Sequence, residues 1–152
     1  MSKVQISVTA NSQLSQICGQ ITNGIKHEME RRAYLASNEL RTAELLVLRG
    51  QRGGRRYRVP GTKRTYTASA PGEPPAVRTG IFRLSWQPVT YVGFGSYISR
   101  IESDVTVGSK RRYNLGELLE QGTGKMAARP YQDKILEKAE KPIVKIYSKP
   151  YF

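Results

Sequence analysis

The spacing of apolar residues predicts two elements in the first third of the chain. Residues 3–9 alternate apolar and polar side chains, which indicates a short half-buried strand. From residue 14 onward, apolar residues recur at steps of three and four, which is typical of an amphipathic helix. We expect this helix over residues 12–48, with Asn11 or Ser12 as its N-terminal cap. It would be about 55 Å long, so we expect one end to project from a domain of this size.

A shorter period follows in the second half of the chain. Residues 81–91 place Phe82, Leu84 and Trp86 on one side of a predicted strand. Residues 97–107 also alternate apolar with polar and charged side chains, and the glycines between the two segments indicate a turn. The pattern predicts an antiparallel hairpin with one solvated face.

Two further segments complete the predicted elements. Residues 114–121 carry leucines at helical spacing and form an expected short helix that ends at Gly122. A proline is well suited to the first position of a last helix, which we expect over 130–141. Pro142 is expected to stop that helix, and residues 143–147 to return as a final strand.

Between the long helix and the hairpin all periodicity is lost. Residues 49–78 are rich in Arg, Gly and Pro, and no acidic residue lies between Glu44 and Glu73. We interpret 49–78 as an extended arm or long loop, called the basic arm below, within a single domain over residues 1–152. The predicted fold class is therefore α+β, with a long N-terminal helix packed on a small antiparallel sheet, a C-terminal helix and this arm.

The charge of the chain points to a polyanionic neighbour. Lys and Arg number 25 against 12 Asp and Glu, a formal net charge of +13, which favours contact with DNA, RNA or an acidic protein surface. Arginine forks suit phosphate oxygens, and the tyrosines within the basic arm can stack on bases. Nucleic acid and a partner protein are both open as its ligand, and a solvated loop is the third interpretation. The candidate contact residues are Arg49, Arg52, Arg55, Arg56, Arg58, Lys63 and Arg64.

Few residues could support catalysis or hold a cofactor. Gly124-Lys125 is not a phosphate-binding loop, because Leu119 stands where its first glycine should be and Met126 where its Ser or Thr should be. One histidine and one cysteine cannot build a tetrahedral zinc site. No apolar run approaches the ~20 residues that span a membrane. We expect a protein that is not an enzyme and has no cofactor, no metal and no membrane segment.

Three segments in this order resemble the head–tail joining or tail-completion (neck) proteins of tailed phages, a group similar to lambda's minor tail protein Z. The first is a Pro-Gly-rich lead at 71–75 that runs into Arg-Thr-Gly-Ile-Phe-Arg-Leu-Ser at 78–85, and the second is the hairpin. The third is Leu-Gly-Glu-Leu-Leu-Glu-Gln-Gly-Thr-Gly-Lys-Met-Ala-Ala-Arg-Pro-Tyr at 115–131. The resemblance covers 71–141 and does not extend to the Arg-rich part of the basic arm, residues 49–66. The motif positions are Thr79, Gly80, Glu120, Gly122, Thr123, Gly124, Arg129 and Pro130.

This resemblance implies a structural virion protein. It implies a homo-oligomeric ring, expected as a hexamer, between the portal or connector and the tail tube, through which DNA passes. The ring would be assembled in the cytoplasm of the host bacterium and located at the head–tail junction of the virion. Arg129 is expected to bridge to a carboxylate or carbonyl of the same or the next subunit. The alternative function is a nucleic-acid-binding accessory protein that uses the basic arm.

Overall fold

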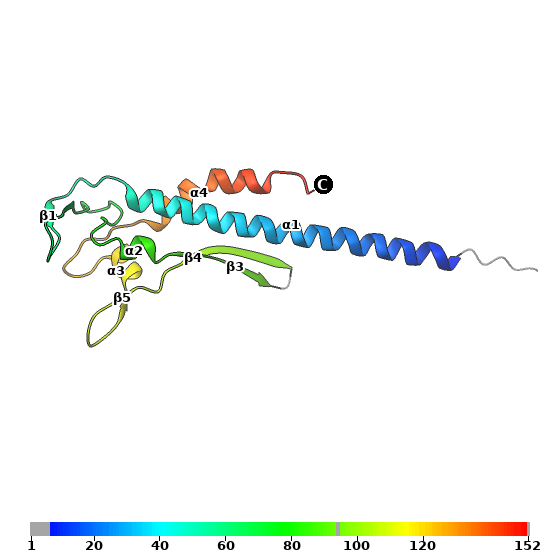
Figure 1. Cartoon of the computed structure of the whole chain (residues 1–152), viewed down its shortest axis with the longest axis horizontal. Coiled ribbons are helices and arrows are strands. Elements are labelled where there is room, and N and C mark those ends of the chain that lie inside the picture. The colour runs from blue at the N-terminus through cyan, green and yellow to red at the C-terminus, as the bar shows by residue number, and fades with distance from the viewer. Residues whose placement is uncertain (1–6, 94, 152) are drawn as a thin grey trace, which may run out of the picture.

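The computed structural model describes residues 7–93 and 95–151 of the chain. It is an α+β fold with a long N-terminal helix, small antiparallel sheets and a C-terminal helix, which confirms the predicted class. In Figure 1 the long helix follows the longest axis, and the other elements lie beside its C-terminal half. In chain order the elements are α1 (Ser7–Arg49), β1 (Arg56–Arg58), β2 (Thr65–Thr67), α2 (Ile81–Leu84), β3 (Gln87–Gly93), β4 (Ser96–Glu102), β5 (Thr106–Val107), β6 (Tyr113–Asn114), α3 (Leu115–Gln121) and α4 (Gln132–Tyr147).

Helix α1 buries one stripe of its C-terminal half and leaves its N-terminal part exposed. Ala33, Ala36, Leu40 and Ala43 are buried at helical spacing, and the small alanine side chains let neighbouring elements come close to the helix. The side chains of residues 13–24 are all exposed, and this part of α1 projects beyond the other elements (Figure 1). The projecting end that the length of the helix predicts is therefore present.

The β3–β4 hairpin lies along one side of α1. Its strands pair in antiparallel register from Gln87 with Glu102 at the open end to the turn. Because side chains alternate along a strand, every second residue of β4 faces α1, and the residues between them are exposed. One of the inward residues, Ser99, donates its hydroxyl hydrogen to the main-chain carbonyl of Ala33 at 2.7 Å. The predicted hairpin is confirmed, and it is bonded to the helix as well as packed on it.

An aromatic cluster closes the core near the C-terminal end of α1. Tyr131, which is only 1% exposed, packs edge-on against Phe82 and Trp86 with ring centroids 5.6 and 5.9 Å away. Its hydroxyl lies against Gly116 of α3, where an added Cβ would come within 2.7 Å of the oxygen. Burial raises the pKa of Tyr131 to about 12, so the phenol stays neutral. The cluster joins α2, α3 and the start of α4 to the buried stripe, which includes Leu40.

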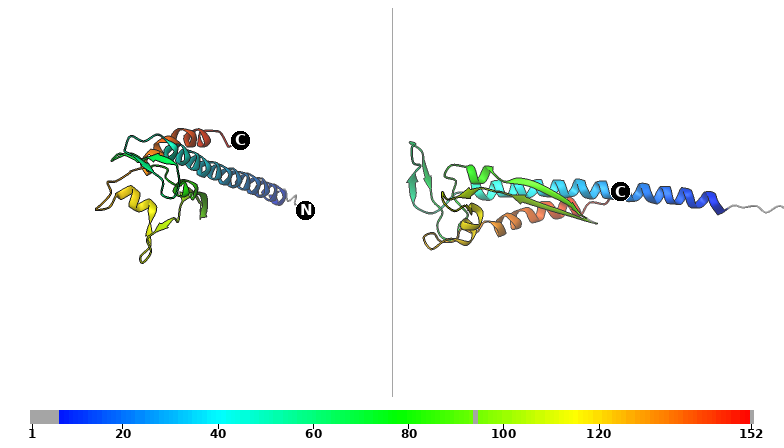
Figure 2. Two further views of the ribbon diagram at one scale, coloured as in Figure 1. Left: turned by 60° about the vertical axis from the view of Figure 1, so that its left-hand side comes forward. Right: turned by 90° about the horizontal axis from the view of Figure 1, so that it is seen from below.

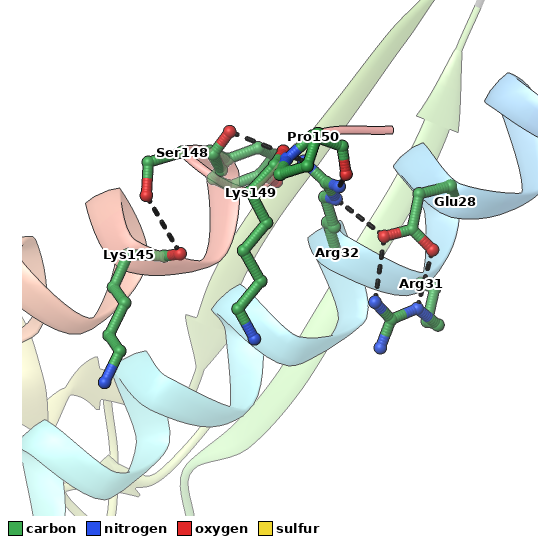
Figure 3. Close-up of polar contacts among 8 residues, drawn as sticks. Glu28, Arg31, Arg32, Lys145, Ser148, Lys149 and Pro150 are labelled. Atoms are coloured by element: carbon green, nitrogen blue, oxygen red, sulfur yellow. Dashed lines mark hydrogen bonds and ion pairs between the residues drawn. The ribbon is translucent and has the colours of Figure 1, made fainter. Parts of the chain in front are cut away.

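The buried side chain of Arg32 ties the end of the described chain to α1. Its guanidinium donates to the main-chain carbonyls of Lys149 and Pro150, each at 2.7 Å, and to the Glu28 carboxylate at 2.7 Å (Figure 3). It also lies 4.0 Å from the ring centroid of Tyr151. A helix leaves its last carbonyls without partners inside the helix. Just past α4, Arg32 of the neighbouring helix α1 supplies the hydrogen-bond donor for such main-chain carbonyls.

The first predicted strand is wrong where the structure describes it. Residues 7–9 belong to α1, which begins at Ser7 and so needs no cap at Asn11 or Ser12, while residues 3–6 lie outside the described residues. A short alternating run specifies a strand only when another strand pairs with it. Extending an existing helix adds one hydrogen bond for each residue fixed, which explains why the helix takes over these positions.

The strand predicted over 81–91 begins six residues later, and its first part is the helical turn α2. Phe82 and Trp86, four residues apart, both reach Tyr131, whereas Leu84 is 61% exposed. The prediction that Leu84 shares a face with these aromatics is therefore wrong. The strand predicted over 97–107 is also interrupted after Glu102, because Thr106 and Val107 pair with β6 instead.

Pro142 does not stop the last helix. Helix α4 continues through it to Tyr147, so the final strand predicted over 143–147 is wrong. Ile135 and Ala139 are buried, and Ile143 packs against the same core cluster. This helical spacing keeps one face of α4 on α1, and the proline removes only one backbone donor, so packing outweighs the local preference of proline.

Arg32→Met is expected to destabilise the fold by about 3 kcal/mol, because it removes the charged donor of the Lys149 and Pro150 carbonyls and one of the two arginines that bind Glu28. The unfolding midpoint should fall by about 6–12 °C for a chain of this length. The matched control is Arg31→Met, which removes the exposed partner of the same carboxylate and should change the midpoint little. Equal effects of the two substitutions in a thermal melt would contradict the role given to Arg32.

Glu28 makes stability depend on acid pH. Hydrogen bonds from Arg31 and then Arg32 lower its pKa from 4.5 to about 2. A carboxyl with a depressed folded-state pKa stabilises the fold above the unfolded value, and this contribution is lost as the pH falls from about 4.5 to about 2. The difference in unfolding midpoint between the wild type and Glu28→Gln should therefore shrink over that range. A difference that stays constant from pH 7 to pH 2 would refute the assignment.

Candidate functional site

The basic arm is folded, not extended. Residues 55–67, called the basic hairpin below, form β1 and β2, which pair Tyr57 with Tyr66 and place their rings 6.1 Å apart. Val59 N donates to Arg64 O at 2.8 Å across the turn, where Gly61 has a φ of 74°. A Pro-Gly pair followed by threonine is a known turn signal, so the sequence carried evidence for this hairpin that the loss of periodicity concealed.

Arg52 has a structural role that separates it from the other candidate contact residues. Its guanidinium donates to Val47 O at 2.8 Å and to Pro75 O at 3.0 Å, so it caps the end of α1 and holds the proline-rich segment. Burial lowers the pKa of Arg52, whereas the nearby Glu73 raises it. Of the predicted set, the exposed members are Arg49, Arg55, Arg56, Arg58, Lys63 and Arg64.

The base of the basic hairpin is fixed by Glu73. Its carboxylate accepts from the main-chain N–H of Gly53 and of Ala70, both at 2.9 Å. These two backbone bonds lower the pKa of Glu73. The nearby hydroxyl of Ser69 donates to Pro74 O at 2.6 Å. Strong contacts at the base therefore hold a hairpin whose arginines are in solvent.

On the hairpin itself two arginines make contacts that leave part of each fork free. Arg56 donates to the Thr65 hydroxyl at 2.8 Å through one terminal nitrogen, and Arg58 donates to Thr62 O through Nε. Arg55, Lys63 and Arg64 make no side-chain hydrogen bond or ion pair to other described residues. These three side chains are therefore the ones most open to a phosphate or carboxylate of a partner.

A second basic hairpin was not predicted from the sequence. β5 and β6 enclose Lys110, Arg111 and Arg112, all exposed, and the Arg111 guanidinium lies 5.4 Å from the Tyr113 ring centroid. The signal was present as three consecutive basic residues that follow a glycine-containing turn and precede a tyrosine. Both basic hairpins lie at the end of the molecule where α1 ends, opposite the projecting helix (Figure 1 and Figure 2).

Residues 120–131, called the elbow below, form a structural turn between α3 and α4. The Glu120 carboxylate accepts from the N–H groups of Tyr131 and Gln132 at 3.0 and 3.3 Å, at the start of α4. A negative charge at a helix N-terminus is favourable. Thr123 pairs with Met126 through two main-chain hydrogen bonds of 2.7 and 3.1 Å. The Glu120 contact positions the buried Tyr131, and the Thr123–Met126 pair closes the turn that leads to it.

The two glycines of the elbow, Gly122 and Gly124, differ in whether their positions leave room for a side chain. Gly122 has a φ of 78°, and a Cβ there would lie 2.7 Å from Ala128 N. Gly124 has nothing within 4 Å of that position, so the close turn requires a glycine at Gly122 and not at Gly124. Earlier in the chain, Gly80 has a φ of 88° before α2, and the Thr79 hydroxyl accepts from Ile81 N at 3.5 Å.

Arg129 contributes its backbone to the elbow and leaves its side chain available. Its N–H donates to Leu119 O at 2.8 Å. Within the described part of the chain no ion pair involves its guanidinium, so a bridge inside the same subunit is not observed. Pro130 is half-buried just ahead of Tyr131, and α4 begins at Gln132 and not at the proline.

An open groove of about 600 Å³ borders the aromatic cluster. Trp86, Tyr131 and Ile101 form apolar parts of its wall, and Glu102 and Glu117 carry acidic groups there. Among the residues described, no group of three or more His, Cys, Asp or Glu side chains is placed to hold a metal ion. No described helix combines the length and apolar character needed to cross a membrane.

Comparison of the chain with protein-family models, curated proteins and solved structures found no match.

The elbow offers a matched pair of substitutions. Gly122→Ala should destabilise the protein by about 2–4 kcal/mol, because it combines a positive φ with overlap against the backbone of Ala128. Gly124→Ala should stay within about 0.5 kcal/mol of the wild type, since a methyl group there meets no neighbour. Denaturant unfolding of both variants measures the difference. Indistinguishable midpoints would show that the elbow is not the close turn described.

Proposed function

We propose that this chain is a structural protein of a tailed-phage neck, where copies of it form a ring that completes the tail or joins it to the head connector. DNA would pass through that ring, and the protein would reside at the head–tail junction of the virion. The observation that carries the proposal is the elbow. The residues that resemble the neck-protein motif, from Glu120 to Tyr131, are linked by main-chain hydrogen bonds within the turn and by the Glu120 carboxylate to the start of α4, which supports a structural role for the motif.

The distribution of charge along the molecule supports an assembly role. The two basic hairpins occupy one end of the long axis, and the projecting part of α1 occupies the other (Figure 1). A chain with a different surface at each end suits a stack of rings, in which one end meets one neighbour and the other end meets another. The solvent-exposed arginines would then face either an acidic ring or the DNA.

The ring is tested by the mass of the purified protein and by its presence in virions. Light scattering should give a defined multiple of the 17.1 kDa chain, with six copies as the expected form. Antibody labelling of virions should place the protein at the junction of head and tail. A protein that is monomeric at every concentration and absent from virions would contradict this proposal.

The second candidate function is binding of nucleic acid by the basic hairpins. Arginine and tyrosine side chains occur together on both hairpins, and Arg55 lies 6.0 Å from the Tyr57 ring centroid. This combination supplies charge for phosphates and rings for bases. It favours DNA or RNA as a ligand whether or not the chain forms a ring.

Neutralising Arg55, Lys63 and Arg64 together by substitution with Gln should weaken DNA binding. These side chains make no hydrogen bond or ion pair to another described residue, so the fold should persist. The slope of log K against log salt should fall by about 0.9 for each lost phosphate contact. The matched control replaces Lys138, Lys141 and Lys145 of α4 with Gln, which removes the same charge far from the hairpins and should leave the slope nearly unchanged.

The two triple variants also separate DNA contact from protein contact. If the hairpin docks on a partner protein, the hairpin variant should lose assembly into tails while its DNA affinity matches that of the α4 variant. If both triple variants lower DNA affinity equally, the binding is a diffuse effect of net charge, and the basic hairpin is not a specific DNA contact.

A further inference from the structure

The projecting part of α1 is uncharged in an otherwise highly charged protein. No charged residue lies between Lys3 and Lys26, although a quarter of the chain, 24%, is charged. Exposed helix surface normally carries charges. Depletion of charge on a surface is a feature of the central part of protein interfaces. The absence of charge therefore favours this segment as a surface for contact with another protein surface.

An apolar stripe on the same segment is exposed and packs on no other element that the structure describes. Leu14, Ile17 and Ile21 are 61%, 51% and 48% exposed. Leu14, Cys18, Ile21 and Ile25 follow one another at steps of four, three and four, the spacing of a seam between packed helices. We call residues 14, 18, 21 and 25 the seam. Leu14, Cys18 and Ile21 lie within residues 13–24, whose side chains are all exposed, and Ile25 is half-buried.

Helix stability gives an independent reason for a partner. Residues 7–25 extend about 28 Å without tertiary support over most of their length. An isolated helix of this size is marginal in water, and Gly19 lies in its middle with open space around it, which costs stability relative to alanine. Helices of this kind are held by packing, so the ordered state of the segment calls for a second surface along the seam.

We propose that the seam packs side by side, in parallel, against the same segment of a neighbouring copy of this chain. The net charge of +13 makes two copies repel each other across most of their surface. The uncharged segment is where two copies can meet without bringing like charges together, and a self-contact needs no complementary charge from another protein. The parallel arrangement rests on the proposed ring, because subunits related by cyclic symmetry point the same way.

Parallel pairing places a useful reporter in the seam. The only cysteine of the chain is Cys18, which is exposed. In parallel packing the Cys18 side chains of neighbouring copies lie at the same level. In an antiparallel pair, or in docking on a different surface, they are separated along the helix. A short bismaleimide should therefore join two copies of the wild-type protein and yield a product of twice the 17.1 kDa chain mass.

Matched charge variants test whether the seam causes this contact. Leu14→Lys with Ile21→Lys adds two charges in the seam, and Gln16→Lys with Gln20→Lys adds the same two charges on the opposite face of the helix. Both pairs replace exposed residues, so each monomer should keep its fold by circular dichroism. We expect the seam variant to lose cross-linking and to shift toward lower mass by light scattering, while the control stays like the wild type.

The outcomes distinguish this inference from the ring itself. An oligomer of wild-type mass that gives no Cys18 cross-link, or that survives the seam charges unchanged, overturns the seam contact and leaves the ring in place. Loss of assembly in the seam variant alone supports the contact. A cross-linked, seam-dependent oligomer that is absent from virions supports the contact and overturns the neck function.

Discussion

The C-terminal half of α1 is the surface on which the rest of the molecule is built. The β3–β4 hairpin donates to its main chain through Ser99, and α4 lies along it with Ile135 and Ala139 buried. Arg32 links α1 to the segment that follows α4, because its fork binds Glu28 of its own helix and the carbonyls of that segment. A single helix that is packed along only half its length explains both the small core and the large exposed surface of the protein.

The predictions that succeeded are those that rest on the local spacing of apolar residues. Helical spacing identified α1 and α3, and alternation identified the β3–β4 hairpin, because these elements bury a regular stripe or face. The errors lie where tertiary packing overrides a local rule. Phe82 and Trp86 form a helical turn to reach Tyr131, and Pro142 stays helical because the residues on both sides of it pack on α1. Tyr131 is far in sequence from Phe82 and Trp86, and α1 is far from Pro142, so no local pattern could have revealed these contacts.

The candidate contact residues were also predicted only in part from the sequence. Their basic character was visible in the sequence, but the structural duty of Arg52 was not, because its acceptors lie at Val47 and Pro75. The elbow residues were recognised as a motif, and the structure assigns each a physical task, such as the bonds from the start of α4 to Glu120. Conformation also separates Gly122 from Gly124, which the sequence alone presents as equivalent.

The position of Arg32 has a consequence for how the protein is made. Residues 147–151 are synthesised long after α1 has left the ribosome, and they supply the acceptors and the ring that Arg32 needs. Until then the Arg32 guanidinium has only Glu28 beside it, so α4 can pack through Ile135 and Ala139 before this polar contact with the end of the helix forms. A chain cut short before residue 147 would leave the Arg32 guanidinium with Glu28 as its remaining partner and would lose the polar contact that fastens the end of α4 to α1.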